Sequence, residues 1–138
     1  MAYNLTVYLV LYIYLNHFAA CIFFYIGKIQ LEEHPNDRFD NRTWMSVFGE
    51  AEFHDYEPIL DMPMFDQYIH SLYWAYATCG TVAYGDIIPV TPVEKIYGFI
   101  VMIIAKIFVA FIYAEAASLV SGANQARNTY EQKKTMVK

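Results

Sequence analysis

The stretch that decides the fold is residues 67–86, which read QYIHSLYWAYATCGTVAYGD. Its first part, residues 67–78, is mostly apolar and predicts a short helix, with Pro63 near the first turn, where a proline is tolerated. At about 1.5 Å per residue, this helix is too short to cross a bilayer. The second part, residues 79–86, is expected to have non-helical backbone. The chain must therefore accommodate a half-length helix that ends in an irregular strand.

Two long apolar blocks lie on either side of this stretch. Residues 5–26 contain no Asp, Glu, Lys or Arg, and residues 96–120 contain only Lys106 and Glu115 as charged side chains. A run of roughly 20 apolar residues crosses a bilayer core of about 30 Å. The first block lacks the basic n-region and the small-residue cleavage site of a signal peptide. We therefore expect two membrane-spanning helices.

The charged residues are unevenly distributed along the chain, whose formal net charge is −5. Residues 27–66 contain ten acidic and three basic side chains, whereas residues 121–138 contain four basic and one acidic. Because basic flanks favour the cytoplasm, we expect the acidic segment outside and both termini inside. The acidic cluster is most simply a solvated surface, but it would also concentrate cations, an effect that salt screens. Asn41 begins a glycosylation sequon, and its place in the segment expected outside agrees with that orientation.

The order of these segments is that of a re-entrant pore loop. Non-helical backbone at membrane depth is tolerated only where it is buried in protein or lines a water-filled path. A single chain with two spanning helices cannot enclose such a path. The sequence therefore predicts an oligomeric, multi-pass membrane protein.

Three stretches of the chain resemble one family of channels. Residues 17–21 read HFAAC, residues 71–74 read SLYW and are followed by TVAYGDIIPVT at 81–91, and residues 124–130 read NQARNTY. They are similar to the outer-helix motif H-W-x-x-C, the pore motif Y-W…TVGYGD and the start of the C-linker in potassium channels of the cyclic-nucleotide-binding-domain family. That family includes the ether-à-go-go, hyperpolarisation-activated, cyclic-nucleotide-gated and plant inward-rectifier types.

The resemblance implies an all-α membrane protein with two transmembrane helices, a re-entrant pore helix and a selectivity-filter loop in a tetrameric pore. It implies a homotetramer or heterotetramer in a lipid bilayer, in the plasma membrane, with permeant K⁺ and no cofactor or nucleic acid. Voltage-sensor and cyclic-nucleotide-binding domains would belong to a longer parent chain. The expected parts of the single pore domain, residues 1–138, are the outer helix at 5–26, the extracellular acidic turret at 27–66, the pore helix at 67–78, the filter at 79–86, the inner helix at 94–120 and the start of the cytoplasmic C-linker at 121–138.

A potassium filter replaces the hydration shell of the ion with rings of backbone carbonyls and a threonine hydroxyl. The residues that match those positions in this chain are Thr81, Val82, Ala83, Tyr84 and Gly85. By the same resemblance, Trp74, Thr78 and Asp86 would support the filter. Trp74 and Tyr84 are spaced like the aromatic packing that holds such filters open, and Asp86 would cap the outer mouth.

Four residues depart from the family's pattern. Ala83 replaces a glycine in a strand that needs positive φ, which costs about 1–2 kcal/mol in each subunit. Ala77 replaces a glutamate found in many potassium channels, which leaves Asp86 without that partner. Gly80 replaces a threonine hydroxyl beneath the filter, and Ala105 stands at the usual hinge glycine. These changes leave open a weakly selective cation channel as an alternative to a potassium channel.

One face of the inner helix matches the cavity lining of the family, and it carries Met102, Lys106, Val109 and Tyr113. Charge within a membrane is costly and usually functional. If Lys106 points into the cavity, four ammonium groups would repel a permeant cation. Alternatively, its ammonium turns toward a neighbouring helix near Asn16 or His17, loses its proton, or snorkels. Together with Ala83, this lysine keeps open a third possibility, a non-conducting regulatory subunit of a heteromeric channel.

We expect the remaining polar and sulfur-containing side chains to have roles in packing and not in catalysis or metal binding. Glu115 lies on the opposite face from Lys106, so an ion pair between them would join different subunits. His17 and Cys21 are one turn apart, but two ligands do not make a metal site, so K⁺ at the filter is the only metal we expect. Cys21 and Cys79 both fall at membrane depth and are expected to be packing thiols. The sequence contains no nucleophile–base pair, phosphate loop or metal cluster, so we do not expect an enzyme.

Overall fold

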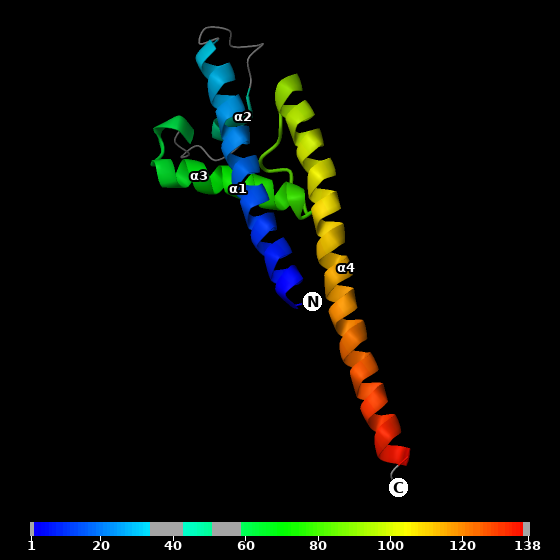
Figure 1. Cartoon of the computed structure of the whole chain (residues 1–138). Coiled ribbons are helices and arrows are strands. Elements are labelled where there is room, and N and C mark those ends of the chain that lie inside the picture. Colours follow the sequence, from blue (N-terminus) through cyan, green and yellow to red (C-terminus); the bar gives the residue numbers. More distant parts are fainter. Residues whose placement is uncertain (1, 34–42, 51–58, 137–138) are drawn as a thin grey trace.

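The computed structural model describes residues 2–33, 43–50 and 59–136. All regular secondary structure in these ranges is helical, as the sequence predicts. The elements shown in Figure 1 are α1 (Ala2–Glu33), α2 (Trp44–Glu50), the short 3₁₀ helix η1 (Ile59–Asp61), α3 (Met64–Cys79) and α4 (Pro92–Met136). The expected glycosylation site, Asn41, lies outside the described residues, and so do many of the acidic side chains of residues 27–66.

Helices α1 and α4 are each long and apolar enough to cross a membrane, over Tyr3–Glu32 and Pro92–Gln132. Both are longer than the helices expected at residues 5–26 and 94–120. α4 has 45 residues, which at a rise of 1.5 Å give a length of about 68 Å, roughly twice the bilayer core. The two candidate membrane spans predicted from the sequence are therefore present.

The inner helix α4 shows no break. It is helical through Ala105, where the family's hinge glycine would stand, and through residues 121–136, where we expected the start of the C-linker. The C-terminal end of α4 consequently reaches well beyond the N-terminal end of α1 (Figure 1).

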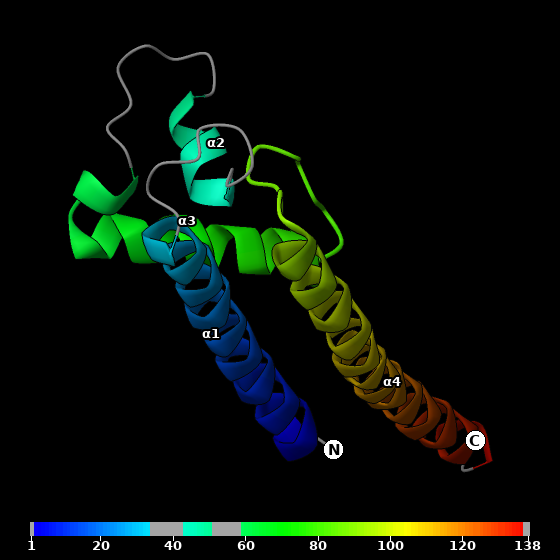
Figure 2. The same ribbon diagram turned by 90° about the horizontal axis from the view of Figure 1, so that it is seen from above.

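Helix α3 crosses α1, and its C-terminal end reaches α4 (Figures 1 and 2). It begins after Pro63, the N-cap residue, whose φ of −52° and ψ of 144° are non-helical. Asp66 in the first turn places a negative charge near the positive end of the helix dipole. Its 16 residues are slightly more than the twelve expected, but still too few to cross a bilayer.

A stack of three aromatic rings holds α1, α2 and α3 together. The ring of Phe23 on α1 lies between Trp44 on α2, at 4.8 Å between centroids, and Trp74 on α3, at 3.6 Å. All three side chains are buried. Trp44 also donates its indole N–H to the backbone carbonyl of Phe23 at 3.3 Å. A side chain at Gly27 would place its Cβ 2.5 Å from the Trp44 indole nitrogen, so this glycine allows Trp44 to pack on α1.

The N-terminus of α4 is fixed by a capping box. The backbone N–H of Glu94 donates to Oγ1 of Thr91 at 3.2 Å, and the Glu94 carboxylate accepts from the backbone N–H of Thr91 at 3.1 Å. Pro92 follows at the first helical position, where its missing N–H is not needed. Sequence reasoning missed this cap, although Thr-x-x-Glu is its signature.

Candidate functional site

The residues after α3 turn their amides back toward the helix. Four successive backbone N–H groups donate to carbonyls of the last turns of α3: Gly80 to Tyr76 at 2.8 Å, Thr81 to Thr78 at 3.2 Å, Val82 to Ala77 at 2.9 Å and Ala83 to Ala77 at 3.1 Å. In contrast, no carbonyl of residues 81–84 accepts a hydrogen bond from another described residue. These residues are also exposed. Because backbone carbonyls are strong acceptors, their oxygens are available to a ligand from outside the chain, and a cation would suit them.

The sign of φ alternates along this strand. φ is 60° at Thr81, 45° at Ala83 and 85° at Gly85, whereas the residues between them do not have positive φ. Neither a helix nor an ordinary β-strand has this two-residue alternation. The sequence predicted positive φ at Ala83 and Gly85 but not at Thr81, where a β-branched side chain makes it an outlier.

A cavity of about 160 Å³ lies behind the strand, between α3 and α4. It is lined by Trp74, Ala77, Thr78, Ala83, Tyr84, Gly85, Asp86, Ile87, Ile88, Pro89, Gly98 and Met102. Thr78, expected to support the filter, therefore borders this space and also accepts the Thr81 amide. Since Ala83 is part of the lining, empty volume adjoins the residue that replaces a glycine.

Tyr73 supports the outer end of the strand. Its ring stacks on Tyr84, with 6.3 Å between centroids and 5° between planes. The nearby Asp86 carboxylate, acting chiefly as a hydrogen-bond acceptor, raises the pKa of the Tyr73 phenol. The Tyr73 phenol is therefore the titratable group that interacts with Asp86, whereas position 77 carries an alanine. Sequence reasoning missed Tyr73 because it sought a carboxylate at position 77.

Within the single chain, Trp74 and Tyr84 stack on other rings. Trp74 is buried and stacks on Phe23. Its ring centroid also lies 6.4 Å from that of Tyr97 on α4. Tyr97 in turn donates its hydroxyl to the carbonyl of Ala19 at 3.0 Å. Trp74 and Tyr84 both line the cavity, but Tyr84 stacks on Tyr73. Trp74 therefore anchors α3 to α1 and α4.

A steric constraint explains why position 80 carries a glycine. A Cβ at this position would lie 2.8 Å from the backbone oxygen of Tyr76, which accepts the Gly80 amide. A threonine here would force the end of α3 to shift, because the obstructing atom is backbone. The glycine is thus required by the tight turn out of α3.

The model of one protein family matches most of the chain. The match covers residues 1–128, and the family is described as "Ion transport protein". The chain belongs to the ion transport protein family. This assignment places it among channels and not among enzymes.

Potassium channels are among the relatives of this family member. It is 29% identical over 116 residues to potassium channel GORK of Arabidopsis thaliana, covering 83% of this chain and 13% of the relative. It is 25% identical over 130 residues to potassium channel KOR1 of Oryza sativa, covering 94% and 14%. It is 25% identical over 125 residues to the voltage-gated inwardly rectifying potassium channel KCNH7 of Mus musculus, covering 88% and 10%.

These matches confirm the family resemblance read from the sequence, because plant potassium channels and KCNH channels both occur among the relatives. The chain spans only about a seventh or less of the length of the relatives named here. The activity of these longer proteins is therefore only a proposal for this chain.

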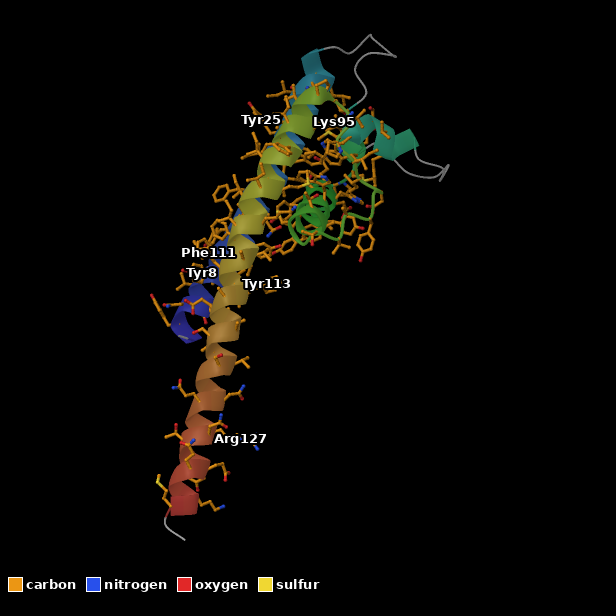
Figure 3. All side chains as sticks on the ribbon, turned by 90° about the vertical axis from the view of Figure 1, so that its right-hand side faces the viewer. Tyr8, Tyr25, Lys95, Phe111, Tyr113 and Arg127 are labelled. Carbon is orange, nitrogen blue, oxygen red and sulfur yellow. The ribbon has the colours of Figure 1, made fainter. Side chains whose placement is uncertain are left out.

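The face of α4 expected to line a cavity lies on the side of residues 81–86. Met102 borders the cavity behind the strand, and Figure 3 shows Tyr113 extending from α4 on the side where α3 lies. Val109, between them in sequence, is partly exposed. Lys106 is exposed and forms no hydrogen bond or ion pair with any residue that the structure describes.

The helix-interface partners considered for Lys106 make other contacts, although Oδ1 of Asn16 is buried without a hydrogen-bond partner. Asn16 donates to the carbonyl of Tyr12 at 2.7 Å, and Nδ1 of His17 lies 2.9 Å from the Tyr68 hydroxyl. Within one chain, the lysine therefore does not pair with either of them. Its ammonium is free to face a pore, a neighbouring subunit or lipid.

Four other residues singled out in the sequence lie on α1, α3 and α4, namely His17, Cys21, Cys79 and Glu115. His17 Nε2 lies 3.8 Å from the Cys21 sulfur, and no cluster of three or more potential metal ligands occurs among the described residues. Glu115 accepts a hydrogen bond from Asn4 at 3.4 Å, which joins the N-terminal end of α1 to the middle of α4. The thiol of Cys79 is fully buried and that of Cys21 is exposed.

Proposed function

We propose that four copies of this chain form a pore that conducts K⁺ passively through residues 81–85. The observation that carries the proposal is the strand of alternating φ, whose carbonyls have no partner among the described residues. Rings of such carbonyls, one strand from each subunit, can replace the hydration shell of K⁺. The relatives named as potassium channels support K⁺ as the ion.

The need for an oligomer follows from the exposure of the strand. Every residue from 81 to 86 is exposed in the single chain, yet the strand lies between two helices of membrane-spanning length. Exposed non-helical backbone is not tolerated against lipid, so other copies must cover it. In this arrangement α3 is a re-entrant half-helix, the family's fourfold pore is the natural assembly, and Met102, Val109 and Tyr113 line the inner cavity.

The orientation of α3 also favours a cation. Its C-terminal end is the end from which the filter strand emerges. The carbonyl end of a helix carries a partial negative charge. Four such ends around the inner mouth of the filter would attract a cation and disfavour an anion.

Two other functions have specific observations in their favour. Left-handed backbone at Thr81 and Ala83 stores strain, and a strained filter favours a weakly selective cation channel. The unpartnered Lys106 on the filter side of α4 favours a non-conducting subunit that modulates conducting partners in a heterotetramer. Flux from this chain alone separates conduction from regulation, and the ratio of K⁺ to Na⁺ flux separates the two kinds of channel.

The test is K⁺ and Na⁺ flux through the purified chain in liposomes. We expect K⁺ flux well above Na⁺ flux, with protein-free liposomes as the blank. Gly85→Ala is the matched variant, because a Cβ there meets no atom within 4 Å while the φ of 85° disfavours a side chain. It should reduce K⁺ flux through backbone strain alone. Equal K⁺ and Na⁺ flux would favour the weakly selective channel, and no flux would contradict conduction by this chain alone.

A further inference from the structure

Glu94 is a buried carboxylate at the point where the outer mouth meets α4. Its side chain is fully buried, and it stands three residues after Thr91, at the end of the segment that leads out of the filter. No basic side chain forms an ion pair with it in the described part of the chain. A buried charge is costly unless it is well hydrogen-bonded. The hydrogen-bond donors around Glu94 therefore show which segments its carboxylate connects.

Three backbone N–H groups donate to this carboxylate. Oε2 accepts from Val90 at 2.8 Å and from Thr91 at 3.1 Å, and Oε1 accepts from Trp44 at 3.2 Å. A capping box requires only the bond from the N-cap residue, Thr91. The bonds from Val90 and Trp44 are additional, and they come from the filter-exit segment and from the first residue of α2.

We call the Glu94 carboxylate and its three backbone donors the clasp, and a further hydrogen bond connects it to α1. The hydroxyl of Thr91 donates to the side-chain oxygen of Gln30 on α1 at 2.9 Å. Trp44 is packed on α1 through Phe23, which in turn stacks on Trp74 of α3. One carboxylate thus joins the filter-exit segment, α2 and the start of α4 where all of them adjoin α1.

We propose that Glu94 is a positioning residue for the filter. Its carboxylate fixes Val90 and Thr91, and thereby the outer end of the filter strand at Gly85 and Asp86, relative to α2 and α4. Hydrogen bonds to a charged acceptor are stronger than those between neutral groups, which suits a fixed anchor. The role in ion selectivity rests on the proposed function, but the structural role of the clasp does not.

The test compares Glu94→Gln with Thr91→Val and Lys95→Gln. Glu94→Gln keeps the shape and one acceptor oxygen, but it removes the charge and puts an N–H₂ group opposite the backbone donors on one side, so it breaks one side of the clasp. Thr91→Val weakens the same helix cap and the bond to Gln30 but leaves the carboxylate and its three donors. Lys95 is the exposed neighbour of Glu94 on α4 (Figure 3). A role limited to capping α4 would make Glu94→Gln and Thr91→Val behave alike.

The first readout is amide hydrogen exchange, which does not require conduction. In Glu94→Gln we expect faster exchange at Trp44 and Val90, about tenfold at whichever amide faces the new N–H₂ group, the order of effect of one lost bond to a charged group. The change should extend to Val82 and Ala83 in the filter strand and be absent in the two other variants. Faster exchange that stops at Val90, or equal changes in Thr91→Val, would overturn the positioning role.

The second readout is the K⁺ to Na⁺ permeability ratio in liposomes. Glu94→Gln should lower this ratio, Lys95→Gln should leave it near the wild-type value, and Thr91→Val, which keeps the three donors to the carboxylate, should lower it less than Glu94→Gln does. An unchanged ratio in Glu94→Gln would overturn a role in selectivity. A wild type without K⁺ flux would count against the proposed function, and amide exchange at Val82 and Ala83 would still decide whether Glu94 positions the strand.

Discussion

At the scale of single residues, Ala83 shows how one methyl group changes the energetics of the filter strand. Its φ of 45° is left-handed, a conformation that costs a residue with a Cβ about 1–2 kcal/mol. The cavity that Ala83 adjoins leaves room for the methyl group. The cost therefore lies in the backbone conformation more than in contacts with neighbours.

We expect Ala83→Gly to stabilise each subunit by about 1 kcal/mol and to raise K⁺ conductance or selectivity. Thermal unfolding and K⁺ flux measure the two effects. Ala77→Gly on α3 is the control, because glycine within a helix costs about 0.5–1 kcal/mol and should lower the melting temperature. If Ala83→Gly changed neither quantity, the surroundings would already accommodate the alanine.

Tyr73 allows the contributions of a ring and a hydroxyl to be separated. Tyr73→Phe keeps the ring that stacks on Tyr84 and removes the donor to Asp86. We expect conduction to be shorter-lived in this variant, because the outer end of the filter loses a tether. The decay of K⁺ current during sustained conduction measures the effect, and Tyr73→Leu, which also removes the ring, should decay faster. Identical decay in Tyr73→Phe and wild type would show that the hydroxyl does not hold the filter.

The sequence predicts positive φ in residues 81–85 only at the two positions where the family's pattern has glycine. The pattern around Ala83 and Gly85 indicated positive φ at both, and both have it. Thr81 could not be predicted, because its side chain disfavours positive φ and bonds from the strand to the end of α3 hold it there. Tyr73 was missed for a similar reason, since its partnership with Asp86 depends on how the chain turns after α3.

At the scale of elements, α2 is the part of the fold that the sequence did not predict. Its seven residues are too few to show a helical period, and they lie in a segment expected to be an acidic loop. Tertiary packing of Trp44 on α1 fixes its position. The existence of α1, α3 and α4 could be predicted because their apolar runs are long, whereas their ends depended on caps such as Thr91 and Glu94.

Gly27→Ala tests whether α2 is held by the close packing of Trp44 on α1. A Cβ at residue 27 would lie 2.5 Å from the Trp44 indole nitrogen, so the tryptophan must move. We expect a loss of stability of about 1–3 kcal/mol, the usual cost of overpacking, and a change in tryptophan fluorescence.

Gly98→Ala is the control for that substitution. Its Cβ would meet Pro89 at 3.5 Å and Trp74 at 3.7 Å, which are ordinary contacts. It should preserve stability, because alanine is also the better helix former. Equal stability of Gly27→Ala and wild type would show that Trp44 is not tightly held.

At the scale of the whole molecule, the single chain leaves its most important surface uncovered. The filter strand and the Met102 and Tyr113 side chains are exposed, and the family assignment supports an assembly that would cover them. The sequence predicted two spans and a helical fold because hydrophobicity and length encode them. The contacts between subunits could not be predicted, since they depend on surfaces that only the folded chain presents.

Lys106 is the charged side chain of α4 that we expect to affect K⁺ flux through the assembly. We expect Lys106→Ala to raise K⁺ flux severalfold without changing selectivity, because four ammonium groups on the filter side of α4 would repel cations. Lys95→Ala, at the outer end of the same helix, is the control. Unchanged flux in Lys106→Ala would place the lysine away from the pathway. A silent wild type with an active Lys106→Ala would make the lysine a plug and favour the regulatory role.

The reversal potential of the purified protein in a planar bilayer, with K⁺ on one side and Na⁺ on the other, tests the central claim most directly. The claim is that the free carbonyls of residues 81–84 select K⁺. We predict a current that reverses far from zero, in the direction set by K⁺ permeability. A steady current that reverses at zero would contradict the claim.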